Sequence, residues 1–134
     1  MEEKSVNSPG GSRAFELFFE RRPAYLYARV AGQEDSYEIS RQFWQEIADE
    51  CRRLDCKKVL IVEEIVMEAP LHDVYQLASE LPHMGFRGVK VAFVDRLAED
   101  RQINEFGALV ATNRGFHGQI FNDFDEAEKW LLRD

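Results

Sequence analysis

Residues 58–62 read Lys-Val-Leu-Ile-Val, and this run decides the fold of the chain. Its apolar residues follow one another without alternation, which is typical of a strand covered on both faces and therefore central in its sheet. Residues 89–94 read Val-Lys-Val-Ala-Phe-Val and predict the next strand, and Gln-Ile-Phe at 119–121 predicts a short last one.

Three amphipathic helices are predicted around these strands. Apolar residues recur at helical spacing over 40–54, over 71–81 and over 103–110. Pro70 suits the first position of the second helix, because the N–H that proline lacks would have no partner there. Pro82 is expected to end that helix.

Polar caps and a glycine mark other helix ends. Asp35 and Glu38 form a capping box if the first helix begins early, and Asp123 and Glu126 form a second box. Gly115 is expected to close the third helix in a left-handed conformation. The second box opens a closing helix whose inward face is Phe124, Ala127, Trp130 and Leu131.

Two aromatic-rich, near-alternating runs precede the first helix. They cover 15–20 and 24–32, and Arg-Arg-Pro at 21–23 predicts a turn between them. The pattern predicts a β-hairpin. One face of this hairpin is expected to join the core, with Phe15, Leu17 and Phe19 on one strand and Leu26, Ala28 and Val30 on the other.

The predicted order of elements is therefore ββαβαβαβα. Strands separated by helices need parallel crossovers, whereas a hairpin is antiparallel. The fold class is thus α/β, with a mixed, mostly parallel sheet that carries an N-terminal antiparallel hairpin. Apart from Met1, residues 1–12 hold one sizeable apolar side chain, Val6, and predict a flexible N-terminal tail. Residues 13–134 predict a single domain.

Composition limits the classes of partner. A length of 134 residues fits one domain, and 17 Lys plus Arg against 25 Asp plus Glu give a net charge of −8. This balance disfavours nucleic acid and anionic membrane surfaces. The sequence has no apolar run of signal-peptide or membrane-spanning length, so we expect no membrane insertion and a cytoplasmic location. Cys51 and Cys56 are expected to be reduced thiols.

The sequence contains no pattern typical of an active site or a metal centre. His72, His83 and His117 have neither i,i+4 partners nor a nearby cluster of metal ligands. Glu63 and Glu64 are neighbours on a strand, so they point to opposite faces and cannot both contact one substrate. We therefore expect no catalytic residues, no metal, no cofactor and no enzymatic activity.

The second face of the hairpin carries a mixture of residue types that is common at protein interfaces. Phe18 lies on the first strand, and Tyr25, Tyr27 and Arg29 lie on the second. Aromatic side chains beside arginine favour a partner-binding face. In the alternative interpretation, a helix or the N-terminal tail covers these aromatic side chains.

Four segments together resemble a known family. They are the strand over 25–32 that ends in glycine, the strands over 59–62 and 89–95, and residues 115–131, which read GFHGQIFNDFDEAEKWL. From about Phe15 to Leu132 the chain resembles the STAS-like proteins, and most nearly their small stand-alone SpoIIAA-like branch, which has the fold of the sporulation anti-sigma factor antagonist. The resemblance implies a non-enzymatic domain that binds another protein and, in some relatives, an apolar ligand or lipid beneath the helices.

The chain departs from that family at one position. Antagonists of the sporulation type carry a phosphorylatable serine at the start of the helix that follows the central strand. The matching residues, 63–72, include neither Ser nor Thr. A switch that works by adding phosphate charge there is therefore not expected.

We thus expect a STAS-like protein-interaction or regulatory domain that docks a partner protein or a second copy of itself. The docking surface is expected on the hairpin face or on the loop over 64–70. The residues expected to bind the partner are Phe18, Tyr25, Tyr27, Arg29, Glu64, Met67, Glu68 and His72. The alternative function is a binder or carrier of a small apolar ligand or lipid, favoured by the apolar residues 65–67. A cavity too small for an acyl chain would count against the lipid.

Overall fold

The computed structural model describes residues 4–5, 14–96 and 101–133. The elements in chain order are β1 (Lys4–Ser5), β2 (Phe15–Arg21), β3 (Leu26–Glu34), α1 (Tyr37–Leu54), β4 (Lys58–Met67), α2 (Leu71–Glu80), the short 3-10 helix η1 (Leu81–His83), β5 (Lys90–Asp95), α3 (Arg101–Asn113), β6 (Gly118–Phe121) and α4 (Phe124–Leu132).

The strands form a single sheet whose spatial order is the chain order, from β1 to β6. The pairs β1–β2 and β2–β3 are antiparallel, whereas β3–β4, β4–β5 and β5–β6 are parallel. The α/β class, the N-terminal hairpin and the parallel crossovers predicted from the sequence are therefore confirmed. The strand β4 lies between two parallel neighbours, as its continuous apolar run predicts.

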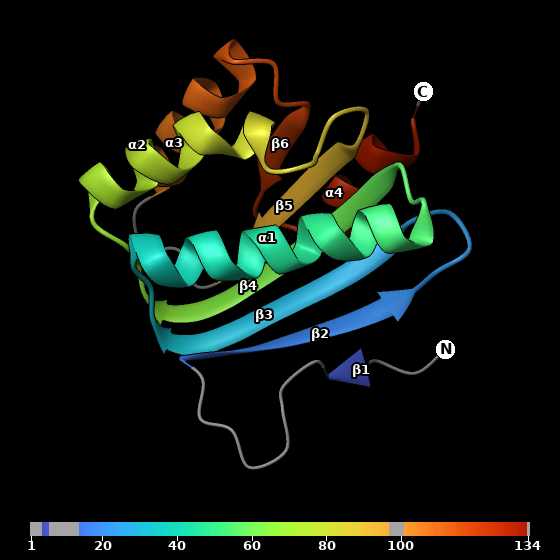
Figure 1. The fold of residues 1–134 in the computed structure, drawn as a ribbon, viewed down its shortest axis with the longest axis horizontal. Helices are drawn as coiled ribbons and strands as arrows, with labels where there is room; N and C mark the ends of the chain where they lie inside the picture. Colours follow the sequence, from blue (N-terminus) through green and yellow to red (C-terminus); the bar gives the residue numbers. More distant parts are fainter. Residues whose placement is uncertain (1–3, 6–13, 97–100, 134) are drawn as a thin grey trace.

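Helices cover both faces of the sheet (Figure 1), and each face has its own core. The larger core lies beneath α1, α2 and α3 and includes Leu17, Leu26 and Ile61. The smaller core lies beneath α4 and includes Tyr27 and Leu60. Successive side chains of β3 and β4 thus alternate between two buried faces.

The N-terminus of α1 differs from the expected one. The helix begins at Tyr37, and the N-cap is Ser36, whose side chain accepts a hydrogen bond from the Ile39 amide. The proposed capping box of Asp35 and Glu38 is therefore wrong. The carboxylate of Asp35 instead accepts hydrogen bonds from the Ser36 amide, at 2.8 Å, and the Ser40 hydroxyl, at 2.6 Å.

The other predicted helix ends agree with the structure to within a few residues. The side chain of Asp123 caps α4 by accepting from the Glu126 amide. Gly115 follows α3 with a φ of +96°, the left-handed conformation that glycine adopts at low cost. Pro70 is the N-cap of α2 rather than its first helical residue, and Pro82 lies inside the short helix η1.

The predicted flexible tail over residues 1–12 lies largely outside the described residues. Within it, Lys4 and Ser5 pair with Phe19 and Phe18 of β2 as the edge strand β1. No helix among the described residues is both long and apolar enough to cross a membrane.

Candidate functional site

A pocket lies between the sheet and the helices α1, α2 and α3. Its volume is about 100 Å³. Its walls are largely apolar, and they come from α1, the end of β4, α2, β5, α3 and β6: Trp44, Ile65, Ala69, Val74, Leu77, Ala78, Leu81, Val91, Phe93, Ile103, Ala108, Ala111, Phe116 and Ile120. Val74, Ile103 and Ile120 line the pocket and are partly exposed, so the pocket reaches the protein surface.

Three carboxylates from consecutive parallel strands also line the pocket. Asp35 directly follows β3, Glu63 lies within β4, and Asp95 is the last residue of β5. Glu63 and Asp95 stand opposite each other in the β4–β5 register. The carboxyl ends of parallel strands meet at one edge of the sheet, where open α/β folds bind their ligands. We call these three residues the acid cluster.

Hydrogen bonds hold the acid cluster in place. Glu63 shares hydrogen bonds with both Asp35 and Asp95. Asp35 is held from α1 by Ser40, and the amide of Asn104 on α3 donates to Asp95 Oδ2 at 2.7 Å. The cluster therefore connects three strands with two of the helices that form the pocket walls.

Burial and mutual repulsion change the proton affinity of the acid cluster. Burial raises the pKa of Glu63 well above its usual value, and the negative charges of Asp95 and Asp35 raise it further. Burial also raises the pKa of Asp35, although its hydrogen bonds with Ser40 and Ser36 act in the opposite direction. Glu63 thus keeps its proton to a higher pH than an exposed carboxyl would. That proton is available for the hydrogen bonds that Glu63 shares with Asp35 and Asp95.

The charged lining of the pocket is wholly acidic. Besides the acid cluster, Glu68 lines it, and the described lining includes no Lys, Arg or His. No group of three or more His, Cys, Asp or Glu side chains in the described part of the chain has the geometry to hold a metal ion. The pocket therefore has largely apolar walls and an acidic end where carboxyl groups can form hydrogen bonds.

The structure separates the eight predicted partner-binding residues into three groups. Tyr25 and Tyr27 belong to the core beneath α4 and are only 5% and 8% exposed. The Tyr25 hydroxyl donates to Glu128 of α4 at 2.6 Å, and the ring of Tyr27 packs edge-on against Phe124. The expectation that these two tyrosines form an open face is therefore wrong, because α4 covers them, as in the alternative interpretation.

Phe18, Arg29 and Glu64 form the second group. The guanidinium of Arg29 lies 4.3 Å from the centre of the Phe18 ring, and its Nη1 is 3.2 Å from Glu64 Oε1. Glu64 Oε2 is also 3.6 Å from Arg96 Nη1. Glu63 lines the pocket, whereas Glu64 makes these ion pairs. The two neighbouring carboxylates therefore lie in different environments, as their positions on opposite faces of the strand predict.

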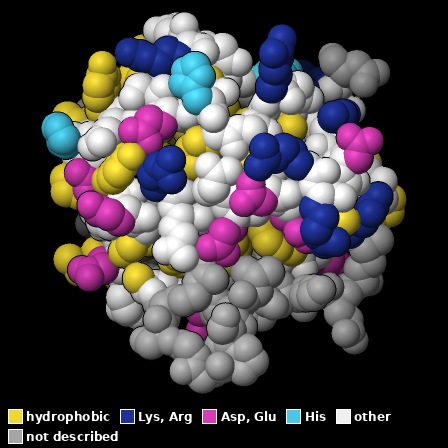
Figure 2. Space-filling model, viewed as in Figure 1, with side chains coloured by type: hydrophobic (Ala, Val, Ile, Leu, Met, Phe, Trp, Pro, Cys, Tyr) yellow, Lys and Arg dark blue, Asp and Glu magenta, His cyan; other side chains and the backbone are white. Residues whose placement is uncertain are grey.

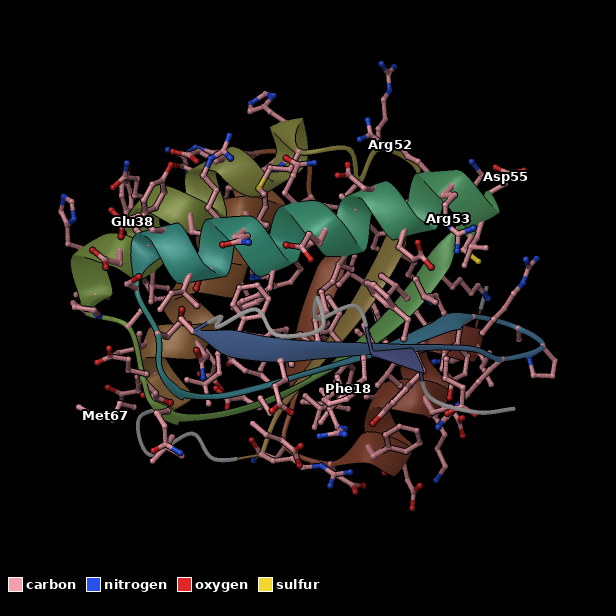
Figure 3. All side chains as sticks on the ribbon, turned by 60° about the horizontal axis from the view of Figure 1, so that its bottom comes forward. Phe18, Glu38, Arg52, Arg53, Asp55 and Met67 are labelled. Carbon is pink, nitrogen blue, oxygen red and sulfur yellow. The ribbon has the colours of Figure 1, made fainter. Side chains whose placement is uncertain are left out.

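The third group lies at the end of β4 and the start of α2. Met67 is 62% exposed, the His72 side chain is exposed, and Glu68 lines the pocket. Figure 3 shows Met67 at the end of the sheet, well apart from Phe18. The structure therefore does not bring the predicted residues together into one surface.

Further exposed apolar side chains lie near the third group in sequence and on α3. They come from the end of β4 and from the outer sides of α2 and α3, and we call them the outer patch: Val66, Met67, Leu71, Tyr75, Phe106 and Leu109. The rings of Tyr75 and Phe106 stack with their centres 6.1 Å apart, which joins the α2 and α3 parts of the patch. Hydrophobic side chains are visible along the edge of the molecule where α2 begins (Figure 2).

Sequence reasoning missed the acid cluster. The local pattern predicts a helix cap at Asp35, an adjacent pair of carboxylates at Glu63 and Glu64, and only the end of a strand at Asp95. The available signal was positional: each carboxylate stands at or near the carboxyl end of a predicted parallel strand.

The comparisons with known proteins support the fold alone. No family model matches the chain, and no curated protein matches it. Among solved structures, the chain is similar to an uncharacterised protein of the DUF3478 family from Shewanella loihica PV-4, whose crystal structure is described as having a SpoIIAA-like fold. The similarity has a TM-score of 0.53 at 16% identity and covers 94% of this chain and 100% of that one. The chain therefore has a SpoIIAA-like fold, as the resemblance in its sequence implied.

Proposed function

We propose that this chain is a non-enzymatic binding domain whose pocket takes a small ligand with an apolar body. The observation that carries the proposal is the pocket itself, which is lined by apolar side chains from α2, α3 and the sheet and reaches the surface beside the partly exposed Val74, Ile103 and Ile120. Largely apolar pockets with a few convergent polar groups are the usual form of small-molecule sites.

The size of the pocket favours a small ligand over a lipid. An apolar cavity of about 150 Å³ accepts benzene, and the pocket here has about 100 Å³. A body of about four or five carbon atoms fits such a volume. An acyl chain does not fit, so the lipid carrier expected as one alternative is not proposed.

The side chains around the pocket support binding rather than catalysis. Carboxyl groups with a raised pKa are also found in general acids and bases. The Ser40 hydroxyl donates to Asp35, but the described pocket lining includes no His to form a Ser-His pair and no Lys or Arg to stabilise a developing oxyanion. Cys51 is buried in the larger core, and burial raises the pKa of its thiol to about 12, which keeps it protonated.

The binding proposal is tested by an NMR titration with isobutanol, a neutral probe with a small branched body. We expect saturable shifts of backbone amide signals around Val74, Leu77 and Ala111. Ala108→Leu places a larger side chain in the pocket and should abolish these shifts. Thr112→Leu adds a similar side chain at an exposed position of the same helix and should leave them unchanged. Shifts that are identical in both variants, or that never saturate, would count against the proposal.

A second function, docking of a partner protein or of a second copy, is favoured by the outer patch. Single exposed apolar residues are ordinary on protein surfaces, but contiguous ones often belong to interaction sites. The patch includes Met67, and His72 directly follows the patch residue Leu71 in sequence. The sequence predicts both Met67 and His72 as partner-binding residues. A regulatory role and the cytoplasmic location remain predictions from the sequence.

Sedimentation velocity tests the self-association form of this second function. If a second copy binds the outer patch, Leu109→Glu should shift the chain from dimer to monomer. Leu132→Glu replaces an exposed leucine of α4, on the opposite side of the sheet, and should not change the oligomeric state. A wild-type chain that stays monomeric at all concentrations leaves no role for the patch in self-association.

A further inference from the structure

A second cleft lies at the amino ends of β3 and β4, at the end of the sheet opposite the acid cluster. It has a volume of about 210 Å³ and lies between the turn that joins β2 to β3 and the loop that joins α1 to β4. Both connections are at the same end of the sheet in Figure 1, and Figure 3 shows Asp55 and Met67 at opposite ends of it. We call this cleft the basic cleft, and its lining residues are Arg21, Arg22, Pro23, Ala24, Tyr25, Asp55, Cys56, Lys57 and Lys58.

The parallel pairing of β3 with β4 brings these two connections together. Leu26 stands opposite Val59 in the register, so the residues that precede them lie side by side at the edge of the sheet. Asp55 ends α1 in a left-handed conformation, with a φ of 52°, which turns the chain from the helix towards β4. Two consecutive arginines and two consecutive lysines, far apart in the sequence, therefore line one cleft.

The basic cleft is locally positive although the chain has a net charge of −8. Four of its lining residues are cations, and Asp55 is the one anion among them. Glu128, which accepts from the Tyr25 hydroxyl, does not line the cleft. The Debye length is about 8 Å at physiological ionic strength, so more distant acidic residues are largely screened. An anion at the cleft therefore interacts with the local charge rather than with the net charge of the chain.

Two of the four cations already have acidic partners. Arg22 Nη2 lies 3.3 Å from Glu20 Oε2, and Arg22 Nη1 donates to the Tyr25 hydroxyl at 2.9 Å. Lys57 Nζ lies 3.2 Å from Asp55 Oδ1. Each of these two ion pairs is neutral overall, so they contribute little net charge to the cleft.

Arg21 and Lys58 supply the remaining positive charge. Neither forms an ion pair with another residue that the structure describes. Arg21 is the exposed last residue of β2, and Lys58 is the partly exposed first residue of β4. A guanidinium has five N–H donors in a planar fork, and an ammonium has three donors. The cleft thus offers two uncompensated positive charges with donors and without acceptors.

We propose that the basic cleft binds a phosphoryl group, with Arg21 and Lys58 as its cationic ligands. A phosphate monoester carries a charge of about −1.5 to −2 at pH 7 and three strong acceptor oxygens, which match the charge and the donors of these two side chains. The cleft has about twice the volume of the apolar pocket, which leaves space for the body of a small ester beside the phosphoryl group. This site is separate from the apolar pocket, so the inference does not depend on the binding function proposed for that pocket.

Amide NMR titrations of the full chain with glycerol 3-phosphate, inorganic phosphate and glycerol test the inference. At constant ionic strength, glycerol 3-phosphate should produce saturable shifts at the amides of Ala24, Cys56 and Lys58, and glycerol should produce none. Inorganic phosphate distinguishes the two sources of a phosphoryl group. Tighter binding of the ester assigns the site to small phosphate monoesters, and equal binding assigns it to free phosphate. Shifts that glycerol reproduces, or that never saturate, would overturn the inference.

Variants separate the basic cleft from a general attraction by positive charge. Lys58→Gln should weaken glycerol 3-phosphate binding about tenfold, which corresponds to one charge-assisted hydrogen bond. Arg21→Gln should have the same effect, and its exposed position keeps the test decisive if Lys58→Gln does not fold. Arg41→Gln is the control, because it removes the same charge near the opposite end of α1, from a partly exposed ion pair with Glu80. It should leave the affinity within about twofold. Equal losses in all three variants would show attraction by net charge only and overturn the inference.

Discussion

Gly107 of α3 and Val74 of α2 approach each other so closely that a Cβ added at Gly107 would lie 2.8 Å from Val74 Cγ1. Both residues line the pocket. The spacing of α2 and α3, and with it the shape of the pocket, therefore depends on the missing side chain at position 107.

This contact predicts an unusual response to Gly107→Ala. Glycine inside a helix is ordinarily about 1 kcal/mol less favourable than alanine, so the substitution would raise the free energy of unfolding in an isolated helix. Here we expect a loss of about 1–2 kcal/mol, because the new methyl group overpacks the contact with Val74. Urea denaturation measures the change. In the Val74→Ala background the same substitution should become neutral or stabilising, and purely additive effects would contradict the explanation.

Glu63 predicts a pH dependence of stability. Its pKa is raised by folding, so above the usual value of 4.5 the folded state retains a proton that the unfolded state has released. The stability of the wild-type chain should therefore fall as the pH rises from 4.5 towards the raised pKa. Glu63→Gln carries no such proton, and its stability relative to wild type should increase across this interval by up to about 1.4 kcal/mol per pH unit.

Denaturation at a series of pH values checks this prediction, with Glu64→Gln as the matched control. Glu64 forms partly exposed ion pairs with Arg29 and Arg96, which contribute only about 0–1 kcal/mol. The stability of Glu64→Gln relative to wild type should therefore not increase with pH. A pH profile of Glu63→Gln that runs parallel to wild type would mean that the buried carboxyl does not retain its proton on folding.

The hydroxyl of Tyr25 should contribute to the attachment of α4. It donates to Glu128 at 2.6 Å and accepts from Arg22 Nη1 at 2.9 Å. Tyr25→Phe leaves these charged partners without the hydroxyl, so we expect a loss of about 1–3 kcal/mol in chemical denaturation. Tyr75→Phe removes the hydroxyl of an exposed tyrosine and should change stability by less than about 0.5 kcal/mol. Equal losses would assign the effect to something other than the contact with α4.

Lys90 should stabilise the end of α4 from the neighbouring strand β5. Its ammonium donates to the backbone carbonyls of Trp130 and Arg133, each at 2.6 Å, and lies 4.4 Å from the centre of the Trp130 ring. Lys90→Met keeps the apolar stem and removes these contacts, so we expect a loss of about 1–2 kcal/mol. Hydrogen exchange should accelerate first at the amides of α4. Lys57→Met, at a side chain that is 69% exposed, is the control and should leave α4 protection unchanged.

The architecture was predictable because its signals are local. The continuous apolar run of β4, the helical spacing in α1 and the cap at Asp123 each need only neighbouring residues. The crossovers β3–α1–β4, β4–α2–β5 and β5–α3–β6 all advance in one direction across the sheet. Right-handed crossovers of that kind place their helices on the same face. The large core beneath α1, α2 and α3 follows from that rule.

The position of α4 and the acid cluster were not predictable in the same way. No strand follows α4 among the described residues, so the rule for crossovers does not assign it to a face. The burial of Tyr25 and Tyr27 depends on that assignment, which is why an open aromatic face remained a plausible interpretation. The acid cluster joins residues that are far apart in sequence, and each member has an ordinary local explanation when it is considered alone.

The central claim is that the cavity between the sheet and the helices α2 and α3 is a ligand site. Intermolecular NOEs between the methyl groups of isobutanol and the protein test it most directly, because they report direct contacts between the probe and named side chains in solution. We predict NOEs to the methyl groups of Val74, Leu77 and Ala108, which disappear in Ala108→Leu. NOEs confined to the outer patch residues Val66, Leu71 and Leu109 would contradict the claim and place the probe on the surface of the same helices.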